Sequence, residues 1–276
     1  MLSDVSFGRY YPSSSFVHKV DPRVKLLLFI AYIVMIFIAQ SFLSLAVAIV
    51  FLCLTVAFSG VPVSAVLKSI KGIIFLVLFT AVLNVLFYVK KEGDTVYFWV
   101  VTKEGLLNAA FLAIRLLALV LGSSVLTLTT TPVSLTDGIE SLLKPLTLIK
   151  FPVHELALIM SIALRFIPTL AAETDRIMNA QKARGADFES GNVFSRMKSL
   201  IPVLIPLLVS AFRRADELGD AMDARCYSGS KNRVKYKQLK FTFRDPIAVI
   251  LTAAFFAGVI LINIYGAEIL ALFAAL

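Results

Sequence analysis

Long runs of uncharged hydrophobic residues alternate with short polar segments along this chain. The runs lack the period-2 alternation of barrel strands, and inside a bilayer the backbone groups of such a run are satisfied only in a helix. A helix that crosses a hydrocarbon core of about 30 Å needs roughly 20 residues. The pattern therefore predicts about five transmembrane helices, within residues 26–39, 42–58, 73–89, 106–128 and 247–264.

The first of these runs is short, because only 14 uncharged residues lie between Lys25 and Gln40. We expect Lys25 to extend its side chain toward the membrane–water boundary and so lengthen the span. A polar segment with two prolines precedes the run, and no small-residue cleavage pattern follows it. We therefore interpret the run as a membrane helix and not as a signal peptide.

The composition agrees with this pattern. Of the 276 residues, 59% are hydrophobic and 16% are charged, against about 45–50% and about 25% in soluble domains. These values exclude an ordinary soluble enzyme, a disordered chain and a fibrous rod. Two cysteines and two histidines argue against a disulfide scaffold or a zinc module. The predicted fold class is all-α, a polytopic helical membrane protein.

Charge sets the predicted orientation in the cell membrane. The segment 131–245 holds 17 of the 27 Lys and Arg residues and 12 of the 18 Asp and Glu residues. The positive-inside rule places this segment and the N-terminus in the cytoplasm. Four predicted helices precede the segment, which agrees with that placement and puts the C-terminus outside. We divide the chain into residues 1–130 with helices one to four, a cytoplasmic or interfacial module at 131–245, and the last helix with its tail at 246–276.

Two helices predicted in this module are apolar in their first halves and charged in their second halves. The apolar runs 156–164 and 200–212 are too short to span a bilayer. Such helices can lie at the membrane–water boundary. The prolines expected to kink or break them are Pro168, Pro202 and Pro206.

The charged halves of the two helices contain an internal repeat. The matched residues are Asp175, Ala180, Ala183, Arg184 and Gly185 in the first copy and Asp216, Ala221, Ala224, Arg225 and Cys226 in the second. Each copy is typical of a helix end, and Gly185 suits a C-cap. On one interpretation, Arg184 and Arg225 complement their helix dipoles and hold local carboxylates. On the other, two equivalent arginines recognise two equivalent grooves of a dimeric or pseudo-dimeric partner.

Arg115 lies near the middle of the fourth predicted helix. Because an intramembrane charge is costly, we expect Arg115 to face the bundle interior or water. Asn84 on the third predicted helix is a candidate partner. A structural role for this pair is the preferred interpretation, with part of a transport path as the alternative.

Further polar residues of the module are expected to form ion pairs. Arg165 and Glu173 lie two turns apart on one helix face, and we expect pairing with Arg176 or Arg214 in preference to catalysis. The basic run 231–240 precedes the last helix and suits anionic lipid headgroups better than nucleic acid.

Together these features resemble a known family, the transmembrane (T) components of energy-coupling factor transporters, also called the cobalt/vitamin-type permease family. The strongest likeness is the pair of Ala-Arg-Gly motifs at the ends of two cytoplasmic coupling helices, here at 183–185 and 224–226, with Cys226 in place of the second glycine. Further likeness lies in residues 11–15, 18–26, 130–132 and 164–173. The resemblance covers nearly the whole chain.

The resemblance implies a noncatalytic subunit of an ATP-driven importer. In this family two ATP-binding-cassette ATPases receive the coupling-helix arginines, here Arg184 and Arg225, in grooves on their surface. A small membrane protein, the S component, captures a vitamin or a metal ion. The helices transmit ATPase motion to that component. ATP and Mg bind to the ATPases, so no cofactor is expected in this chain, and the substrate is not encoded in it.

Two other classes of function remain as alternatives. A self-contained permease or channel would need several polar or ionisable groups inside its spans, where Arg115 and Asn84 stand out. An intramembrane lipid-modifying enzyme would need a cluster of acid, base or metal ligands. The sequence contains no P-loop, no zinc-protease motif and no nucleophile elbow. The coupling subunit is therefore the leading hypothesis.

Overall fold

The structure is a computed structural model that describes residues 10–87, 96–98, 101–188, 190, 192–227, 229 and 239–274. The chain divides into two compact units. The described residues within Gly8–Ile139 and Leu239–Leu276 form the bundle unit, and those within Glu140–Gln238 form the helix-pair unit. Each unit is a set of residues that pack against one another. The division of the chain into 1–130, 131–245 and 246–276 was based on membrane topology and not on packing. That division stays a prediction.

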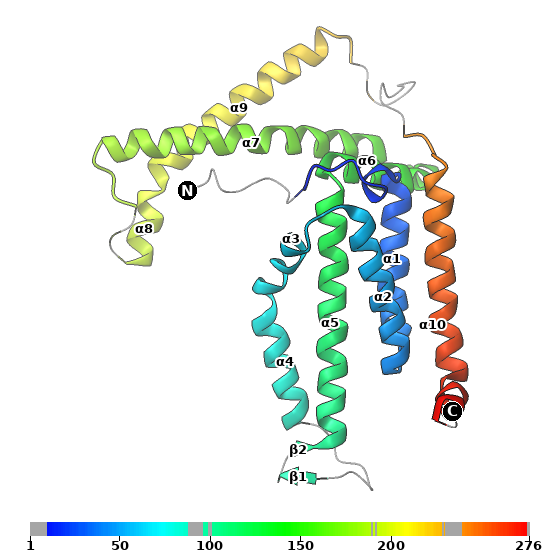
Figure 1. Cartoon of the computed structure of the whole chain (residues 1–276). Coiled ribbons are helices and arrows are strands. Elements are labelled where there is room, and N and C mark those ends of the chain that lie inside the picture. Colours follow the sequence, from blue (N-terminus) through cyan, green and yellow to red (C-terminus); the bar gives the residue numbers. More distant parts are fainter. Residues whose placement is uncertain are drawn as a thin grey trace. The chain divides into compact units, whose positions relative to one another are not determined.

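Long helices make up the bundle unit (Figure 1). They are α1 (Pro22–Ile38), α2 (Phe42–Ser59), α4 (Ile74–Leu86), α5 (Lys103–Thr129) and α10 (Arg244–Ala274). Shorter elements are η1 (Val17–Lys19), α3 (Val63–Leu67), η2 (Ile70–Gly72) and the antiparallel strands β1 (Val96–Phe98) and β2 (Val101–Thr102). Helix α6 (Pro132–Leu143) belongs to both units. Apart from one small hairpin in the described residues, the predicted all-α fold is confirmed.

The helix-pair unit contains η3 (Lys144–Ile149), α7 (Val153–Ala183), α8 (Val193–Ser199) and α9 (Ile201–Asp223). Each long helix is apolar at its start and charged at its end, as predicted. The prolines were expected to kink or break these helices, and the expectation of a break is wrong. Helix α7 continues through Pro168 and α9 through Pro206. Pro202 lies in the first turn of α9, where a helix has no partner for a backbone N–H.

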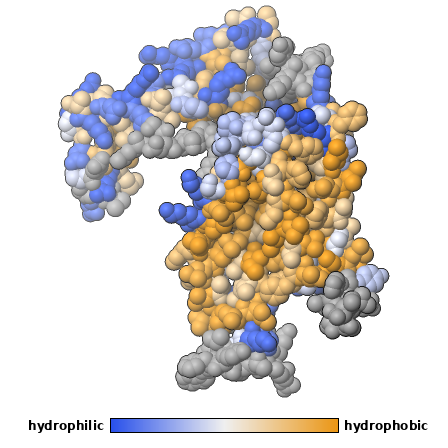
Figure 2. Space-filling model, viewed as in Figure 1, coloured by the Kyte–Doolittle hydropathy of each residue, from blue (hydrophilic) through white to orange (hydrophobic). Residues whose placement is uncertain are grey.

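Five described helical stretches are long and apolar enough to cross a membrane, or six when the bent pair Val63–Gly72 and Ile74–Leu86 counts as one span. They are Phe42–Ser59, Lys103–Thr129, Val153–Ala183, Phe194–Asp223 and Arg244–Gly266. The first, second and last agree with predicted spans. The predicted third span corresponds to α4, a helix of 13 residues that follows the segment Val63–Gly72 after a bend of 58°. Helix α1 corresponds to the first predicted span and has 17 residues. Figure 2 shows hydrophobic side chains covering the visible face of the bundle unit.

The two stretches in the helix-pair unit meet this length and composition test, although their apolar runs were expected to be too short. In helix α7 the apolar run ends at Arg165, and the second halves of α7 and α9 are rich in charge. The interfacial placement of these helices remains a prediction.

Helices α1 and α5 cross closely in the core of the bundle unit. Tyr32 on α1 is buried and donates a hydrogen bond from its hydroxyl to the Ala118 carbonyl of α5, at 2.8 Å. A Cβ atom at Gly122 would lie 2.2 Å from the Tyr32 ring. Glycine is therefore the residue that lets the tyrosine ring fit against α5.

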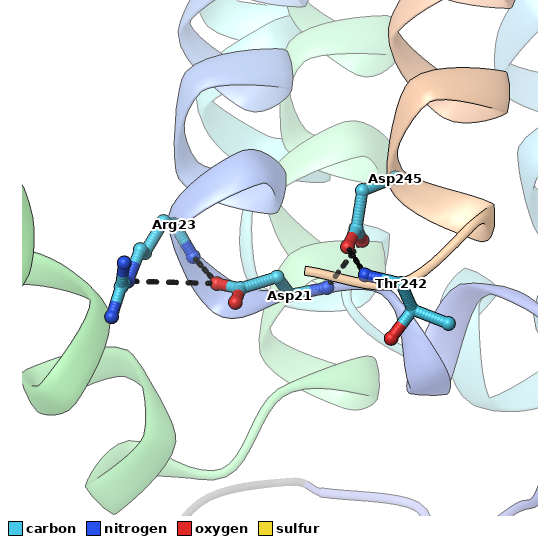
Figure 3. A network of polar contacts seen from close by, with 4 residues as sticks. All are labelled: Asp21, Arg23, Thr242 and Asp245. Atoms are coloured by element: carbon cyan, nitrogen blue, oxygen red, sulfur yellow. Dashed lines mark hydrogen bonds and ion pairs between the residues drawn. The ribbon is translucent and has the colours of Figure 1, made fainter. Parts of the chain in front are cut away.

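Buried polar groups join the starts of α1 and α10 (Figure 3). Asp245, 2% exposed, accepts hydrogen bonds from the backbone N–H of Asp21 at 2.8 Å and of Thr242 at 2.6 Å. Asp21 in turn accepts from the backbone N–H of Arg23 at 2.8 Å and so caps the first turn of α1. The carboxylates therefore fix two helix starts that are more than 200 residues apart in the sequence.

Lys25 joins the same end of α1 to the end of α5. Its ammonium group donates to the carbonyls of Thr129 at 3.0 Å and His18 at 3.3 Å and to the Thr130 hydroxyl at 3.3 Å. The residue is 7% exposed. The expectation that Lys25 extends to the membrane boundary is therefore wrong, because the ends of α5 and η1 supply acceptors for all three of its N–H groups.

The turn between α1 and α2 is satisfied by side chains from two other helices. Arg115 on α5 donates to the Ala39 carbonyl and lies over the Phe111 ring, 4.6 Å from its centroid. Asn263 on α10 donates to the Ile38 carbonyl at 2.7 Å and accepts from the backbone N–H of Gln40 at 3.3 Å. These side chains supply hydrogen-bond partners to the backbone of the turn, which lipid does not offer.

The partner predicted for Arg115 was wrong. The Asn84 amide donates to the Thr80 carbonyl of its own helix, at 3.3 Å. Ala39 lies 14 residues after Lys25, which corresponds to about 21 Å along α1. The turn therefore lies within the depth of the membrane. Arg115 lies at this level because its guanidinium donates to the Ala39 carbonyl of the turn.

Candidate functional site

Helices α7 and α9 cross as an antiparallel pair (Figure 1). Glu173 on α7 forms an ion pair with Arg214 on α9, which is one of the two partners that the sequence predicted. Toward the end of α7, the Gln181 amide donates to the Pro202 carbonyl near the start of α9, at 3.3 Å. One helix therefore begins where the other ends, and the charged end of each helix extends beyond the crossing.

The crossing coincides with the centre of the internal repeat. The offset of 41 residues that relates Arg184 to Arg225 also relates Glu173 to Arg214. Each arginine lies 11 residues beyond the ion pair, which corresponds to about 16 Å of helix. Since the two helices are antiparallel, the repeat gives the pair approximate two-fold symmetry, with one arginine at each far end.

The end of α7 is a Schellman motif with Arg184 as the C-cap residue. The N–H of Gly185 donates to the Lys182 carbonyl and the N–H of Ala186 to the Gln181 carbonyl, both at 3.0 Å. Gly185 has a φ of +89°, a left-handed conformation that glycine adopts without steric cost. The glycine C-cap expected from the sequence is confirmed.

The end of α9 repeats this motif around Arg225. The N–H of Cys226 donates to the Asp223 carbonyl at 2.9 Å, and the N–H of Tyr227 donates to the Met222 carbonyl at 3.0 Å. Cys226 has a φ of +55°. It therefore occupies the same left-handed position as the glycine of the first copy, and Arg225 has the same backbone position as its counterpart.

Both arginines are exposed, as are the flanking Ala183 and Ala224. Within the described part of the chain, neither guanidinium takes part in a hydrogen bond or ion pair. No contact among the described residues therefore supports the interpretation that Arg184 and Arg225 hold local carboxylates. An exposed guanidinium keeps all five N–H donors for a partner.

Arg165 is also exposed on α7, whereas Glu173 is partly buried in its ion pair. Of the ion pairs predicted among Arg165, Glu173, Arg176 and Arg214, the described residues form the pair of Glu173 with Arg214. The basic run 231–240 lies outside the described residues except for its last two positions. Among the described residues, no group of three or more His, Cys, Asp or Glu side chains could hold a metal ion.

Sequence reasoning missed the carboxylate of Asp245 and the amide of Asn263. Both belong to α10 or its start, and both bond to the ends of α1. Asp245 lies just before an apolar run, and an acidic residue in that position is typical of a helix start. This signal could have identified Asp245 from the sequence. Nothing local to Asn263 indicates which helix end it meets.

Known proteins are similar to this chain over most of its length. The family described as cobalt transport protein matches residues 13–236, which include all of α1 to α9. The energy-coupling factor transporter transmembrane protein EcfT of Clostridium kluyveri is 52% identical over 251 residues, covering 90% of this chain and 93% of its own. The chain belongs to the cobalt transport protein family, as a transmembrane component of energy-coupling factor transporters.

Two more relatives carry the same description. The protein of Ruminiclostridium cellulolyticum is 49% identical over 266 residues, covering 95% of this chain and 98% of its own. That of Bacillus subtilis is 45% identical over 253 residues, covering 91% and 95%. This T component is therefore a noncatalytic, multi-pass membrane protein of a transporter, and the family predicted from the sequence is confirmed.

Proposed function

We propose that this T component couples two ATP-binding-cassette ATPases to a small substrate-binding membrane protein, the S component. The observation that carries the proposal is the α7–α9 pair, in which two exposed arginines end equivalent helices at equal distances from one ion pair. We call the helix ends that carry these arginines the arginine tips. Two equivalent tips suit two equivalent grooves, one on each subunit of an ATPase dimer.

The docking residues in this proposal are Arg184 and Arg225 within the segments 183–185 and 224–226. Each arginine protrudes from a hydrogen-bonded helix end, so little conformational freedom is lost at the backbone when it binds. A guanidinium that meets a carboxylate in a groove forms two parallel hydrogen bonds. Such a contact resists displacement better than a single flexible ammonium group, as transmission of force requires.

In this proposal the two helices act as levers that cross at Glu173 and Arg214. Closure of the ATPases on ATP would displace the two tips, and the change in α7 and α9 would act on the S component. That component would release a vitamin or a metal ion into the cell. ATP and Mg belong to the ATPases in this scheme, and no cofactor is assigned to this chain.

The same proposal sets the topology. The N-terminus and residues 131–245 face the cytoplasm, where the ATPases are, and the C-terminus lies outside. The excess of basic residues in this segment supports that orientation. The apolar first halves of α7 and α9 would then lie at the membrane boundary, with their charged second halves in the cytoplasm.

Affinity purification from native membranes in mild detergent tests the proposal. The tagged wild-type chain should co-purify with ATP-binding-cassette ATPases and with a small membrane protein. The double variant R184A/R225A should lose the ATPases and retain the small membrane protein. R176A is the matched control, because Arg176 is an exposed arginine of α7 away from the tip, and it should retain both. Recovery of the wild-type chain alone, from membranes where it supports uptake, would overturn the proposal in favour of an independent permease.

A further inference from the structure

A cavity of about 450 Å³ lies inside the bundle unit between α1, α2, α5 and α10. Its walls include Phe29 and Tyr32 of α1, Phe51 of α2, Val125 of α5 and Leu251 of α10. Pockets that hold small ligands have volumes of about 300–1,000 Å³. The cavity is therefore large enough for a ligand, and nothing in the proposed coupling mechanism uses it.

The polar groups of the cavity wall already have protein partners. The hydroxyls of Thr55, Thr129 and Thr252 each donate to a carbonyl in the preceding turn of their own helix, at 2.8 Å. The Tyr32 hydroxyl is bonded to α5, and Lys25 donates all three N–H groups to protein oxygens. The wall thus presents almost only apolar surface to the cavity.

Water does not suit such a space, because a buried water needs two to four polar partners. An empty space of this size also costs stability, since its lining loses packing contacts. The cavity therefore favours an apolar occupant.

The cavity is accessible from the side of the bundle. Phe58 at the end of α2 and Ile247 at the start of α10 line it and are 60% and 54% exposed. Both helices are apolar enough to cross a membrane, so the medium outside these residues is lipid. A hydrocarbon chain can enter from that medium without crossing water.

Cationic groups stand at the same end of the bundle. Arg244 lies three residues before Ile247 and four before Ala248, which places it one helical turn away on the same face of α10. Arg23 lies over the Phe241 ring, 5.8 Å from its centroid, and its Nε lies 4.0 Å from a carboxylate oxygen of Asp21, which balances part of its charge. A phosphate group at this level would meet positive charge while its chain extended into the cavity.

We propose that the cavity binds one acyl chain of a membrane phospholipid, with the phosphate near Arg23 and Arg244. The chain would fill the space between the start of α1, the end of α5 and the start of α10. These are the helix ends that the buried Lys25 and Asp245 hold together. A bound lipid would therefore be part of the packing of this end of the bundle.

Photolabelling tests the proposal. The full-length protein is reconstituted in vesicles of phosphatidylethanolamine and phosphatidylglycerol with a trace of phosphatidylglycerol that carries a diazirine on its acyl chain. Labelled residues are then located by mass spectrometry of peptides. Tyr32 and Val125 are only 4% and 5% exposed, whereas Ile250 on α10 is 68% exposed. The proposal predicts labelling of all three, because a chain in the cavity reaches residues that bulk lipid does not touch.

The variant A248F places a phenyl ring in the cavity and should lower the labelling of Tyr32 and Val125 roughly tenfold or more, because close packing leaves no space for the chain. Labelling of Ile250 should not change. A253F is the matched control, since Ala253 is an exposed residue of the same helix, and it should leave all three sites labelled. T55F fills the cavity from α2 and should repeat the effect if A248F fails to fold.

Three results would overturn the proposal. The first is labelling of Ile250 without labelling of Tyr32 and Val125 in the wild-type protein. The second is unchanged labelling of those two residues in both cavity-filling variants. The third is labelling by a diazirine detergent in micelles but not by the phospholipid in vesicles, which would indicate an adventitious additive only.

Discussion

At the scale of single residues, the two arginine tips differ at the position that follows each arginine. Both backbones are left-handed there, but one residue is Gly185 and the other is Cys226. A residue with a Cβ atom is strained in this conformation by about 1–2 kcal/mol. The hydrogen bonds of the Schellman motif hold Cys226 in place nonetheless. The helix end of α9 is therefore formed at a conformational cost that the end of α7 does not have.

Substitution C226G should stabilise the end of α9. Relief of the strain by about 1 kcal/mol should slow hydrogen exchange of the Cys226 and Tyr227 amides roughly fivefold. The reverse change G185A should speed exchange of the Gly185 and Ala186 amides by a similar factor. Hydrogen–deuterium exchange of the purified protein measures both. Equal exchange in C226G and the wild-type protein would show that the cysteine is not strained.

At the scale of elements, helix ends are held by side chains from other helices. The start of α1 meets Asp245 from the start of α10, and its end meets Asn263 from the same helix and Arg115 from α5. Helix α1 is short, so its end is at a depth where lipid offers no hydrogen bonds. The intramembrane polar residues therefore have structural partners, which fits the structural role that the sequence suggested for Arg115.

Substitution N263L should destabilise the bundle by about 1–3 kcal/mol, because it leaves the Ile38 carbonyl and the Gln40 N–H unsatisfied. N84L is the matched control. Among the described residues, the Asn84 amide bonds only a carbonyl of its own helix, so its loss should have a much smaller effect. Reversible unfolding in mixed micelles measures the free energy. An equal loss in the two variants would contradict the assignment of Asn263 to the turn.

The ion pair at the crossing of α7 and α9 can be inverted. The single variants E173R and R214E should each lose stability by up to about 1 kcal/mol, since the side chains are only partly buried. The double variant E173R/R214E should recover most of this loss, because the repeat makes the two positions equivalent. A double-mutant cycle in mixed micelles gives the coupling free energy. A double variant that loses as much as the two single variants together would exclude the symmetric pairing.

At the scale of the whole molecule, one chain contains a bundle of apolar helices and a pair of helices that are apolar at their starts and charged at their ends. The two units contain different kinds of packing. The bundle unit has a buried apolar core and a surface suited to lipid, whereas the helix-pair unit buries few residues. Under the proposed function, the bundle unit embeds the protein in the membrane and the helix-pair unit receives force from the ATPases.

If the ATPases hold the two tips as equivalent attachments, the single variants R184A and R225A should weaken binding by similar factors. Each would lose one of two linked contacts, and such a loss lowers affinity by about 10²–10⁴-fold. Titration of the ATPase dimer against the chain in nanodiscs measures both values. Affinities that differ between the two variants by much more than the error would contradict equivalent docking.

Most elements could be predicted from the sequence. Apolar runs, helix ends and the repeat of 41 residues are local patterns, and they predicted three of the spans, the two long helices of the module and Arg214 as one of two candidate partners for Glu173. The family resemblance followed from the same local motifs. Local patterns carry this information because helix formation and lipid exposure depend on neighbouring residues.

Contacts between residues far apart in the sequence followed from the packing of the helices. Lys25 lies buried against the end of α5, Arg115 bonds to the end of α1, and the chain bends by 58° just before α4. The physical reason is that a buried charge or an unpaired carbonyl takes whichever partner the packing brings near, and that partner is 76 residues away for Arg115 and 104 for Lys25. The antiparallel crossing, which turns a sequence repeat into two symmetric tips, was likewise decided by packing alone.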